Sequence, residues 1–446
     1  MLSSPTLNKK TAAILLDPDN STLSYAERSA FRKWRLQILI AGILGYASYY
    51  IVRQNFSLSM PALIEEFGFT KTQLGGAMMA FSIIYAVGKL VNGFISDRSN
   101  ARYFMPAGLA ISALLSLCMG LSTNILSFIA LYALMGWFQS MGWPPMARML
   151  THWFTPKELG LKWAIASAAH QVGGAAIYAV GPLLIISFGW KGAFFIPGIF
   201  SLCIAILLIP LLRDSPKSVG LPAPEAYKGE IIPDEDSRRI TLKELGQIIL
   251  CNPMLWYISM ANMCLYIVRM GVITWAPTFL HEMKGTSLSQ AGLQVAAYDI
   301  AGIVGGLTAG WMSDKLFRGR RGPVGAAYML LLAIALFYFW KAPAGSGWEN
   351  SIAMIFVGFL VYGPQVLIGV AAADLTSKRA VGVANGFSGT FAYVGVGISS
   401  LIIGWIADHY SWDYGFIFFI GAAILGAVFF ALTGLHQTMT TKKKCT

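Results

Sequence analysis

The sequence predicts an all-α membrane protein with twelve membrane-spanning helices, arranged as two pseudo-symmetric six-helix halves. Of its 446 residues, 56% are hydrophobic and only 12% are charged, whereas about 25% of the residues of a soluble domain are charged. About twelve apolar windows can be marked, most of them near the 20 or so residues that a spanning helix requires. Short motifs from the first half of the chain recur in the second half at a nearly constant offset.

The apolar windows are separated by polar segments. They lie near residues 36–57, 73–94, 104–122, 126–147, 162–184, 192–212, 253–275, 288–311, 323–340, 352–374, 381–407 and 414–436. A stretch rich in proline and charge separates the sixth window from the seventh, and such composition is typical of a surface linker. We therefore expect an N-terminal segment over 1–35, helical bundles over 36–212 and 251–437, a linker over 213–250 and a basic tail over 438–446.

Positive charge is concentrated on one side of this topology. Of the 33 Lys and Arg residues, 26 fall in the terminal segments, the linker and the connections on that side. Four fall on the opposite side and three lie within the apolar windows. Because positive residues are retained on the cytoplasmic side of membranes, both termini, the linker and the tail are predicted to be cytoplasmic. Basic segments beside anionic lipid explain the net charge of +12 without nucleic acid.

Two motifs are repeated between the halves. Tyr50–Arg53 reads Tyr-Ile-Val-Arg and recurs 216 residues later at Tyr266–Arg269. The motif ending in Asp97-Arg98 recurs 217 residues later, ending in Asp314-Lys315. Parallel six-helix repeats of this kind are the architecture of major facilitator carriers.

The second motif joins the second and third helix of each half on the cytoplasmic side. A carboxylate there can accept charge-assisted hydrogen bonds from arginine or from the start of a helix. We interpret Asp97, Arg98, Asp314 and Lys315 as residues that hold a cytoplasmic gate closed. The alternative is that they belong to ordinary polar loops.

The repeated arginines indicate an anion site. An arginine inside a bilayer costs about 2.5–3.5 kcal/mol on insertion scales, so Arg53 and Arg269 are expected to have a paired use. A guanidinium is always charged and presents a planar fork of donors. Two such groups facing one cavity favour a doubly charged oxyanion, and phosphate is the first candidate.

Further polar side chains accompany the arginines. Tyr46, Tyr50 and Arg53 share one helical face, and Tyr85 precedes Lys89 by one turn. The tyrosines either line a cavity or belong to an interfacial belt, and Lys89 either lines the cavity or snorkels to the surface. His170 is either a hydrogen-bonded core residue or a ligand for a phosphate.

Asp299 is the acid that we place deep within a span. It is interpreted either as an ion-pair partner of Arg269 or Arg53, which we prefer, or as a site of proton coupling. Gln139, Tyr362, Tyr393 and Asn385 are further polar or aromatic groups in apolar windows. Each of them either contacts the organic part of a ligand or serves packing.

Enzyme and metal motifs are missing from the sequence. It contains no phosphate-cradling Walker loop, no His-Glu-x-x-His and no Gly-x-Ser-x-Gly. Its five cysteines are at unrelated spacings, which suggests neither a disulfide framework nor a metal site. We therefore expect a non-enzyme without a cofactor, which draws its energy from the gradient of a second solute.

These strings together resemble the organophosphate:phosphate antiporters of the major facilitator superfamily, which include the bacterial glycerol-3-phosphate and hexose-phosphate carriers. The resemblance covers nearly the whole chain and rests on Gly45–Arg53, Ser96–Arg102, Gly136–Pro145, His170–Gly174, Tyr266–Arg269, Ser313–Gly319 and Gly363–Gly369. It implies exchange of an organophosphate for inorganic phosphate by a carrier of the bacterial inner membrane, which we expect to be a monomer.

The resemblance also implies roles for individual residues. Arg53 and Arg269 would hold the phosphoryl group, and Lys89 and His170 would assist. Tyr46, Tyr50, Tyr85, Tyr266, Tyr362 and Tyr393 would line the path.

The chain departs from the family pattern in several places. Gln54 and Thr274 replace a lysine and an acid that glycerol-phosphate members tend to carry, so Asp299 must find another partner. Asn385 and Ser388 are neutral where some hexose-phosphate carriers have an acid and a lysine. The preferred ester therefore stays open. A membrane receptor for a sugar phosphate and a proton-coupled symporter that uses Asp299 are the alternative functions.

Overall fold

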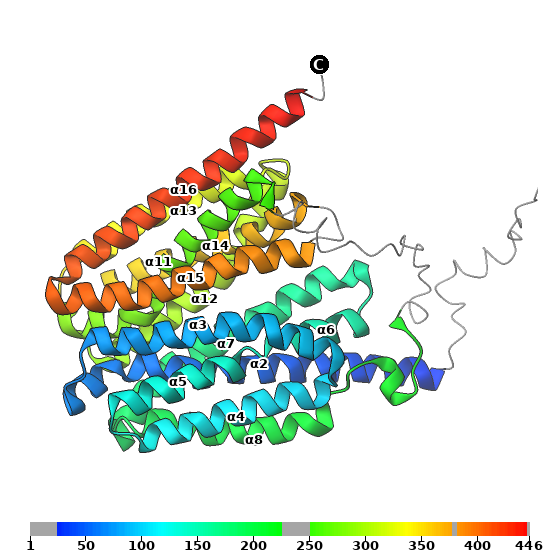
Figure 1. Cartoon of the computed structure of the whole chain (residues 1–446), viewed down its shortest axis with the longest axis horizontal. Helices are drawn as coiled ribbons and strands as arrows, with labels where there is room; N and C mark the ends of the chain where they lie inside the picture. The colour runs from blue at the N-terminus through cyan, green and yellow to red at the C-terminus, as the bar shows by residue number, and fades with distance from the viewer. Residues whose placement is uncertain (1–24, 225–249, 377–380, 444–446) are drawn as a thin grey trace, which may run out of the picture.

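The computed structural model describes residues 25–224, 250–376 and 381–443. These residues form long helices in two bundles (Figure 1). The first bundle contains α2 (Tyr25–Phe67), α3 (Lys71–Arg98), α4 (Ala101–Leu121), α5 (Ile125–Gln139), α6 (Trp143–Trp153), α7 (Pro156–Phe188) and α8 (Gly192–Leu211). The second contains α11 (Pro253–Lys284), α12 (Leu288–Lys315), α13 (Arg321–Lys341), α14 (Gly347–Asp374), α15 (Val381–His409) and α16 (Trp412–Lys443).

The predicted fold class is confirmed. Twelve helical segments within the described ranges are long and apolar enough to cross a membrane, and α5 and α6 together supply one of them. The helices extend beyond the apolar windows: α2 has 43 residues and includes residues 25–35. Windows detect only the apolar part of a helix, whereas side chains that accept hydrogen bonds from the first turn set where it begins. Asn100, Asn124, Asn252 and Ser287 form such caps.

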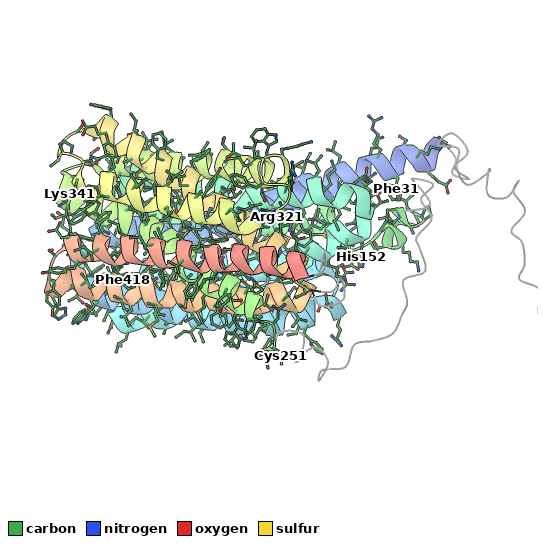
Figure 2. The ribbon with its side chains drawn as sticks, turned by 90° about the horizontal axis from the view of Figure 1, so that it is seen from above. Phe31, His152, Cys251, Arg321, Lys341 and Phe418 are labelled. Carbon is green, nitrogen blue, oxygen red and sulfur yellow. The ribbon has the colours of Figure 1, made fainter. Side chains whose placement is uncertain are left out.

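The bundle has two distinct ends. The start of α2 and the end of α16 lie at one end, called the terminal end below, and the α2–α3 and α11–α12 connections lie at the other, called the distal end (Figure 1). In Figure 2, Lys341 marks the distal end, whereas His152 and Arg321 lie toward the terminal end. Most of the predicted linker, residues 225–249, lies outside the described residues.

Within the described ranges, the two halves meet mainly through three helix pairs, α2 with α11, α3 with α15 and α7 with α12. Hydrogen bonds that join the halves gather toward the distal end. The Ser57 hydroxyl donates to the Thr274 carbonyl at 2.5 Å, and the Tyr178 hydroxyl donates to the Ile273 carbonyl at 3.0 Å. Lys71 forms an ion pair with Glu282 of the second half at 3.2 Å. The described part of the protein is therefore closed at its distal end.

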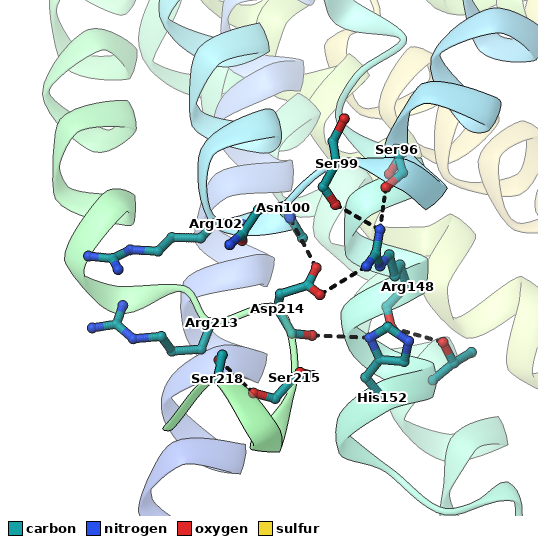
Figure 3. Close-up of polar contacts among 12 residues, drawn as sticks. Ser96, Ser99, Asn100, Arg102, Arg148, His152, Arg213, Asp214, Ser215 and Ser218 are labelled. Carbon is teal, nitrogen blue, oxygen red and sulfur yellow. Dashed lines mark hydrogen bonds and ion pairs between the residues drawn. The ribbon is translucent and has the colours of Figure 1, made fainter. Parts of the chain in front are cut away.

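Arg148 ties together the terminal end of the first half (Figure 3). Its guanidinium donates to the carbonyls of Ser96 and Ser99 at 2.6 and 2.7 Å and to the Asp214 carboxylate at 3.0 Å. The other carboxylate oxygen of Asp214 accepts from the backbone N–H of Ala101 at 3.0 Å. One arginine thus fastens the end of α3, the start of α4 and the segment that follows α8.

We expect Arg148→Ala to lower the free energy of unfolding by about 2 kcal/mol, because hydrogen bonds to a charged group contribute about 1.5–3 kcal/mol and this group is only partly exposed. Thermal unfolding in detergent measures the change. The control is Arg98→Ala, since Arg98 is exposed and donates to Phe94 of its own helix. Equal melting temperatures for the two variants would contradict the prediction.

Candidate anion-binding site

Two arginines occupy repeat-related positions inside the bundle. Arg53 on α2 is 6% exposed and Arg269 on α11 is 4% exposed. A buried tyrosine from the same half supports each helix at this level. The Tyr132 hydroxyl donates to the Arg53 carbonyl at 3.3 Å, and the Tyr298 hydroxyl donates to the Arg269 carbonyl at 3.1 Å. Neither tyrosine was predicted as a site residue, because a tyrosine in an apolar window carries no signal that separates this role from packing.

The Arg53 guanidinium lies among aromatic rings. Its central carbon is 4.8 Å from the ring centroid of Phe81, 5.1 Å from Tyr85 and 5.4 Å from Tyr50. The Tyr46 ring packs against Tyr50 at 5.6 Å. Ring faces attract a cation without neutralising it, so the positive charge of Arg53 remains available to an anion.

Arg269 contacts both halves. One terminal nitrogen lies 3.2 Å from Nε2 of His170, on α7 of the first half, and 3.2 Å from the Tyr362 hydroxyl. Its central carbon is 5.3 Å from the Tyr266 ring. Because a guanidinium only donates, Nε2 of His170 accepts and Nδ1 carries the proton, which it donates to the Ser167 carbonyl. His170 is thus a neutral acceptor here, not yet a donor to a ligand.

A short path of contacts links the two arginines. The Tyr50 ring, next to Arg53, lies 5.2 Å from the His170 ring, and His170 touches Arg269. The structure therefore brings both predicted arginines into one cluster with a tyrosine and a histidine from the first half.

Lys89 and three more tyrosines extend this cluster. The Lys89 ammonium lies 5.4 Å from the centroid of Tyr393, which belongs to the opposite half. The Tyr393 ring is 4.7 Å from Tyr85 and 6.3 Å from Tyr266. Lys89 is half-buried and reaches across to α15. This orientation differs from the one that snorkelling to the surface requires.

Asp299 contacts Arg269 indirectly. The Tyr362 hydroxyl donates to Oδ1 of Asp299 at 2.6 Å and accepts from Arg269 at 3.2 Å. The direct ion pair preferred from the sequence is therefore replaced by a chain in which a phenol lies between the charges. Asp299 also borders the other half: a Cβ added at Gly174 on α7 would lie 2.5 Å from Oδ2.

Gln139 and Asn385 occupy different surroundings. Gln139 is 3% exposed, and its side-chain nitrogen has no hydrogen-bond partner within the described ranges. Asn385 is exposed on α15, with its side-chain oxygen near Gly369 of α14. Neighbouring Ser388 is tied to α11, because Asn262 donates to its hydroxyl at 3.0 Å.

The predicted gate residues are spread over the terminal end. Asp314 forms an ion pair with Arg321, which also pairs with Asp374 at 3.3 Å, so this network stays within the second half. Asp97, Arg98 and Lys315 are exposed, and Arg98 donates to the carbonyl of Phe94 on its own helix. Their action as a gate stays a prediction for the state in which the terminal end closes.

The cluster has an excess of positive charge. Within the described residues, no carboxylate forms an ion pair with Arg53, Arg269 or Lys89. The Nε atom of Arg269 is buried and has no hydrogen-bond partner in that part of the chain. Buried charges are normally paired, because an unpaired one loses its hydration without compensation. The arrangement therefore favours an anionic ligand.

The chain is similar to known proteins over most of its length. Residues 42–368 match the model of the Major Facilitator Superfamily. The chain is 41% identical to the glycerol-3-phosphate transporter of Bacillus subtilis (strain 168), over 91% of this chain and 93% of that protein. It is 38% identical to the "Probable hexose phosphate transport protein" of Chlamydia muridarum (strain MoPn / Nigg), over 91% and 92%.

Two further likenesses bear on function and on fold. The chain is 35% identical to the membrane sensor protein UhpC of Escherichia coli (strain K12), over 91% of this chain and 94% of that protein. A bacterial homologue of the human lysosomal transporter Spinster superposes with a TM-score of 0.74 at 16% identity, over 90% of this chain and 97% of that one, which supports the fold. The chain belongs to the major facilitator superfamily and, within it, to the organophosphate:phosphate antiporter family.

Proposed function

We propose that this protein is a secondary transporter that exchanges a small organophosphate, a hexose 6-phosphate or glycerol 3-phosphate, for inorganic phosphate by alternating access. The observation that carries the proposal is the pair of buried guanidiniums in one cluster without a carboxylate partner among the described residues. A phosphoryl group carries about −1.5 to −2 charge near neutral pH and accepts paired hydrogen bonds from each planar fork.

The relatives support this choice of ligand. Two of them are named as transporters of glycerol 3-phosphate and hexose phosphate, and each matches the chain over nine-tenths of its length. The bacterial relatives support a carrier of the bacterial inner membrane. The clustering of Lys and Arg on the side of the termini supports a terminal end in the cytoplasm. The distal-closed structure then corresponds to a state that takes ligand from the cytoplasm.

Obligatory exchange of one phosphate compound for another would follow from the positive charge of the binding site when no ligand is bound. A phosphate dianion would compensate both guanidiniums and draw α2 and α11 onto one ligand. Without it, closing both ends would enclose two uncompensated cations, which is costly away from water. Loaded carriers would therefore reorient readily and empty ones slowly. His170 would release Arg269 to the ligand, and the chain through Tyr362 to Asp299 would keep that arginine aimed at the site.

We expect Tyr362→Phe to reduce the exchange rate roughly tenfold, because it removes the hydroxyl that accepts from Arg269 and donates to Asp299, and a hydrogen bond to a charged group contributes about 1.5–3 kcal/mol. Asp299→Asn keeps an acceptor for Tyr362 and should have the smaller effect. Initial rates of exchange in reconstituted vesicles measure both. Proton coupling through Asp299 predicts the opposite order, with Asp299→Asn the more severe change.

The function itself is tested with purified protein in vesicles loaded with labelled phosphate. Glycerol 3-phosphate, glucose 6-phosphate and phosphoglycerate are added outside in turn, and efflux of label reports exchange and ester preference. A sensor would bind an ester but release little label. A proton-coupled symporter would accumulate ester in phosphate-free vesicles under a pH gradient. Either outcome would overturn the antiport proposal.

A further inference from the structure

The first turn of α3 receives a cap from the opposite half of the protein. Thr70 caps the helix locally, by accepting from the backbone N–H of Gln73. The Asp408 carboxylate, on α15 of the second half, accepts from the backbone N–H groups of Lys71 at 3.1 Å and Thr72 at 2.6 Å. It also accepts from the Thr72 hydroxyl at 2.6 Å. N–H groups of a first helical turn have no partner within their own helix, so a residue of the other half satisfies two of them here.

Close contact between two helix backbones brings the carboxylate to this position. Ser400, Gly404 and Asp408 are four residues apart and share one face of α15. A Cβ at Gly404 would lie within 3.0 Å of the Lys71 carbonyl oxygen, and a Cβ at Gly75 would lie within 3.0 Å of the Ser400 carbonyl oxygen. Real Cβ atoms essentially never approach so closely. The glycines therefore permit a helix contact that larger residues would hold apart.

A second polar contact joins the halves beside the cap. Lys71 forms an ion pair with Glu282 at 3.2 Å, and the Trp412 indole N–H donates to the same carboxylate at 3.0 Å. This ion pair is only partly buried and contributes little by itself. Asp408 is exposed as well, but its partners include backbone donors at the positive end of a helix dipole, where a carboxylate is favoured.

The cap exists on one side of the pseudo-symmetric interface. Gly292 follows Gly75 by 217 residues, and a Cβ added there would lie within 3.0 Å of the Tyr178 carbonyl oxygen of α7. The α7–α12 crossing is therefore as close as the α3–α15 crossing. The position on α7 that corresponds to Asp408, eight residues after Tyr178, is Ile186. The matching helix α12 is capped by its own Ser287, which accepts from Gln290 at 3.3 Å. The carboxylate is therefore an addition to the α3–α15 contact, not a consequence of the repeat.

We infer that Asp408 is a one-sided latch of the transport cycle, which caps α3 across the interface when the distal end is closed and releases it when that end opens. Opening leaves two backbone N–H groups and a hydroxyl of α3 to water, so the latch favours the distal-closed state. The inference requires only that the halves separate at the distal end. The inference about the latch therefore does not depend on which ligand the protein carries.

Accessibility of a buried reporter tests the latch. In a variant without native cysteines, Thr274→Cys places a thiol at the distal α2–α11 contact, where Thr274 is 3% exposed. We expect Asp408→Ala to raise its labelling by a membrane-impermeant maleimide from the distal side about tenfold, which is the scale of losing a helix cap. Asp408→Asn should lie between Asp408→Ala and the parent.

The matched control is Asp413→Asn, which changes a carboxylate at the same end whose partner, the Trp340 indole N–H at 2.5 Å, lies in its own half. It should leave the labelling rate unchanged. Equal labelling in the Asp408 and Asp413 variants would overturn the latch.

A cysteine pair supplies a test that does not depend on removing the carboxylate. In Thr72→Cys/Asp408→Cys, oxidation should lock the distal end and abolish phosphate exchange, and reduction should restore it. The single variants define the rate that reduction must recover. Cross-linking that leaves exchange intact would show that this contact does not open during transport, and the inference would fail.

Discussion

Arg53→Lys and Arg269→Lys are each expected to reduce phosphate exchange by about two orders of magnitude. Lysine keeps the positive charge but loses the planar fork that donates two parallel hydrogen bonds to one phosphoryl group. Loss of a charge-assisted pair of this kind costs about 3 kcal/mol, and each 1.36 kcal/mol is a factor of ten in rate. For Arg269 the change also removes the donor that holds His170 and Tyr362.

The measurement is the initial rate of labelled phosphate efflux into medium that contains an organophosphate, for equal amounts of reconstituted protein. Arg320→Lys is the control, because Arg320 is exposed at the start of α13. It should retain the parent rate. Parent rates in either single variant of the buried arginines would contradict the proposed site, even if the fold were unchanged.

The fold and the two arginines were predictable from the sequence because both leave strong local signals. A cation inside an apolar window is rare, so Arg53 and Arg269 stand out without any knowledge of their neighbours. The constant offset between the two copies of Tyr-Ile-Val-Arg then indicates that the halves are related. The structure adds that both guanidiniums belong to one cluster, through Tyr50 and His170.

The partners of these charges were less predictable, because they depend on side chains that meet only in the folded chain. Asp299 was expected to pair directly with an arginine, yet the Tyr362 hydroxyl lies between them. His170 was interpreted either as a hydrogen-bonded core residue or as a ligand for a phosphate, and in this state it accepts from Arg269. In both cases a neutral side chain from a distant segment, Tyr362 or His170, takes a hydrogen bond from the Arg269 guanidinium. The sequence had suggested an anion as the partner of this guanidinium.

The contacts that close the distal end were the hardest to predict from the sequence. Ser57 and Tyr178 donate to backbone carbonyls of α11, and any residue could supply such an acceptor. Asp408 lies just beyond the end of its predicted window, 381–407, where a polar residue is expected. Glycines in the apolar windows are more informative about helix contacts, but only a glycine where two helices cross closely is needed for the packing. Gly76, for instance, has open space at its Cβ position, whereas the adjacent Gly75 does not.

Gly292→Ala is accordingly expected to reduce exchange by one to two orders of magnitude, by preventing full closure of the distal end. A Cβ there would lie within 3.0 Å of both the Tyr178 carbonyl oxygen and the Pro182 ring. The α7 helix cannot move aside without disturbing the hydrogen bond from the Tyr178 hydroxyl to the Ile273 carbonyl. Overpacking of this kind costs about 1–3 kcal/mol, and here the cost falls on the distal-closed state.

Two measurements separate this effect from general instability. Gly76→Ala also adds a methyl group to a membrane helix, but into open space, so it should keep the parent exchange rate and the parent labelling of Thr274→Cys. Gly292→Ala should label faster while still binding phosphate ester from the distal side, because its site is unaltered and only closure is blocked. Slow labelling together with normal exchange would mean that α7 and α12 accommodate the methyl group, and that close backbone contact is not needed for the cycle.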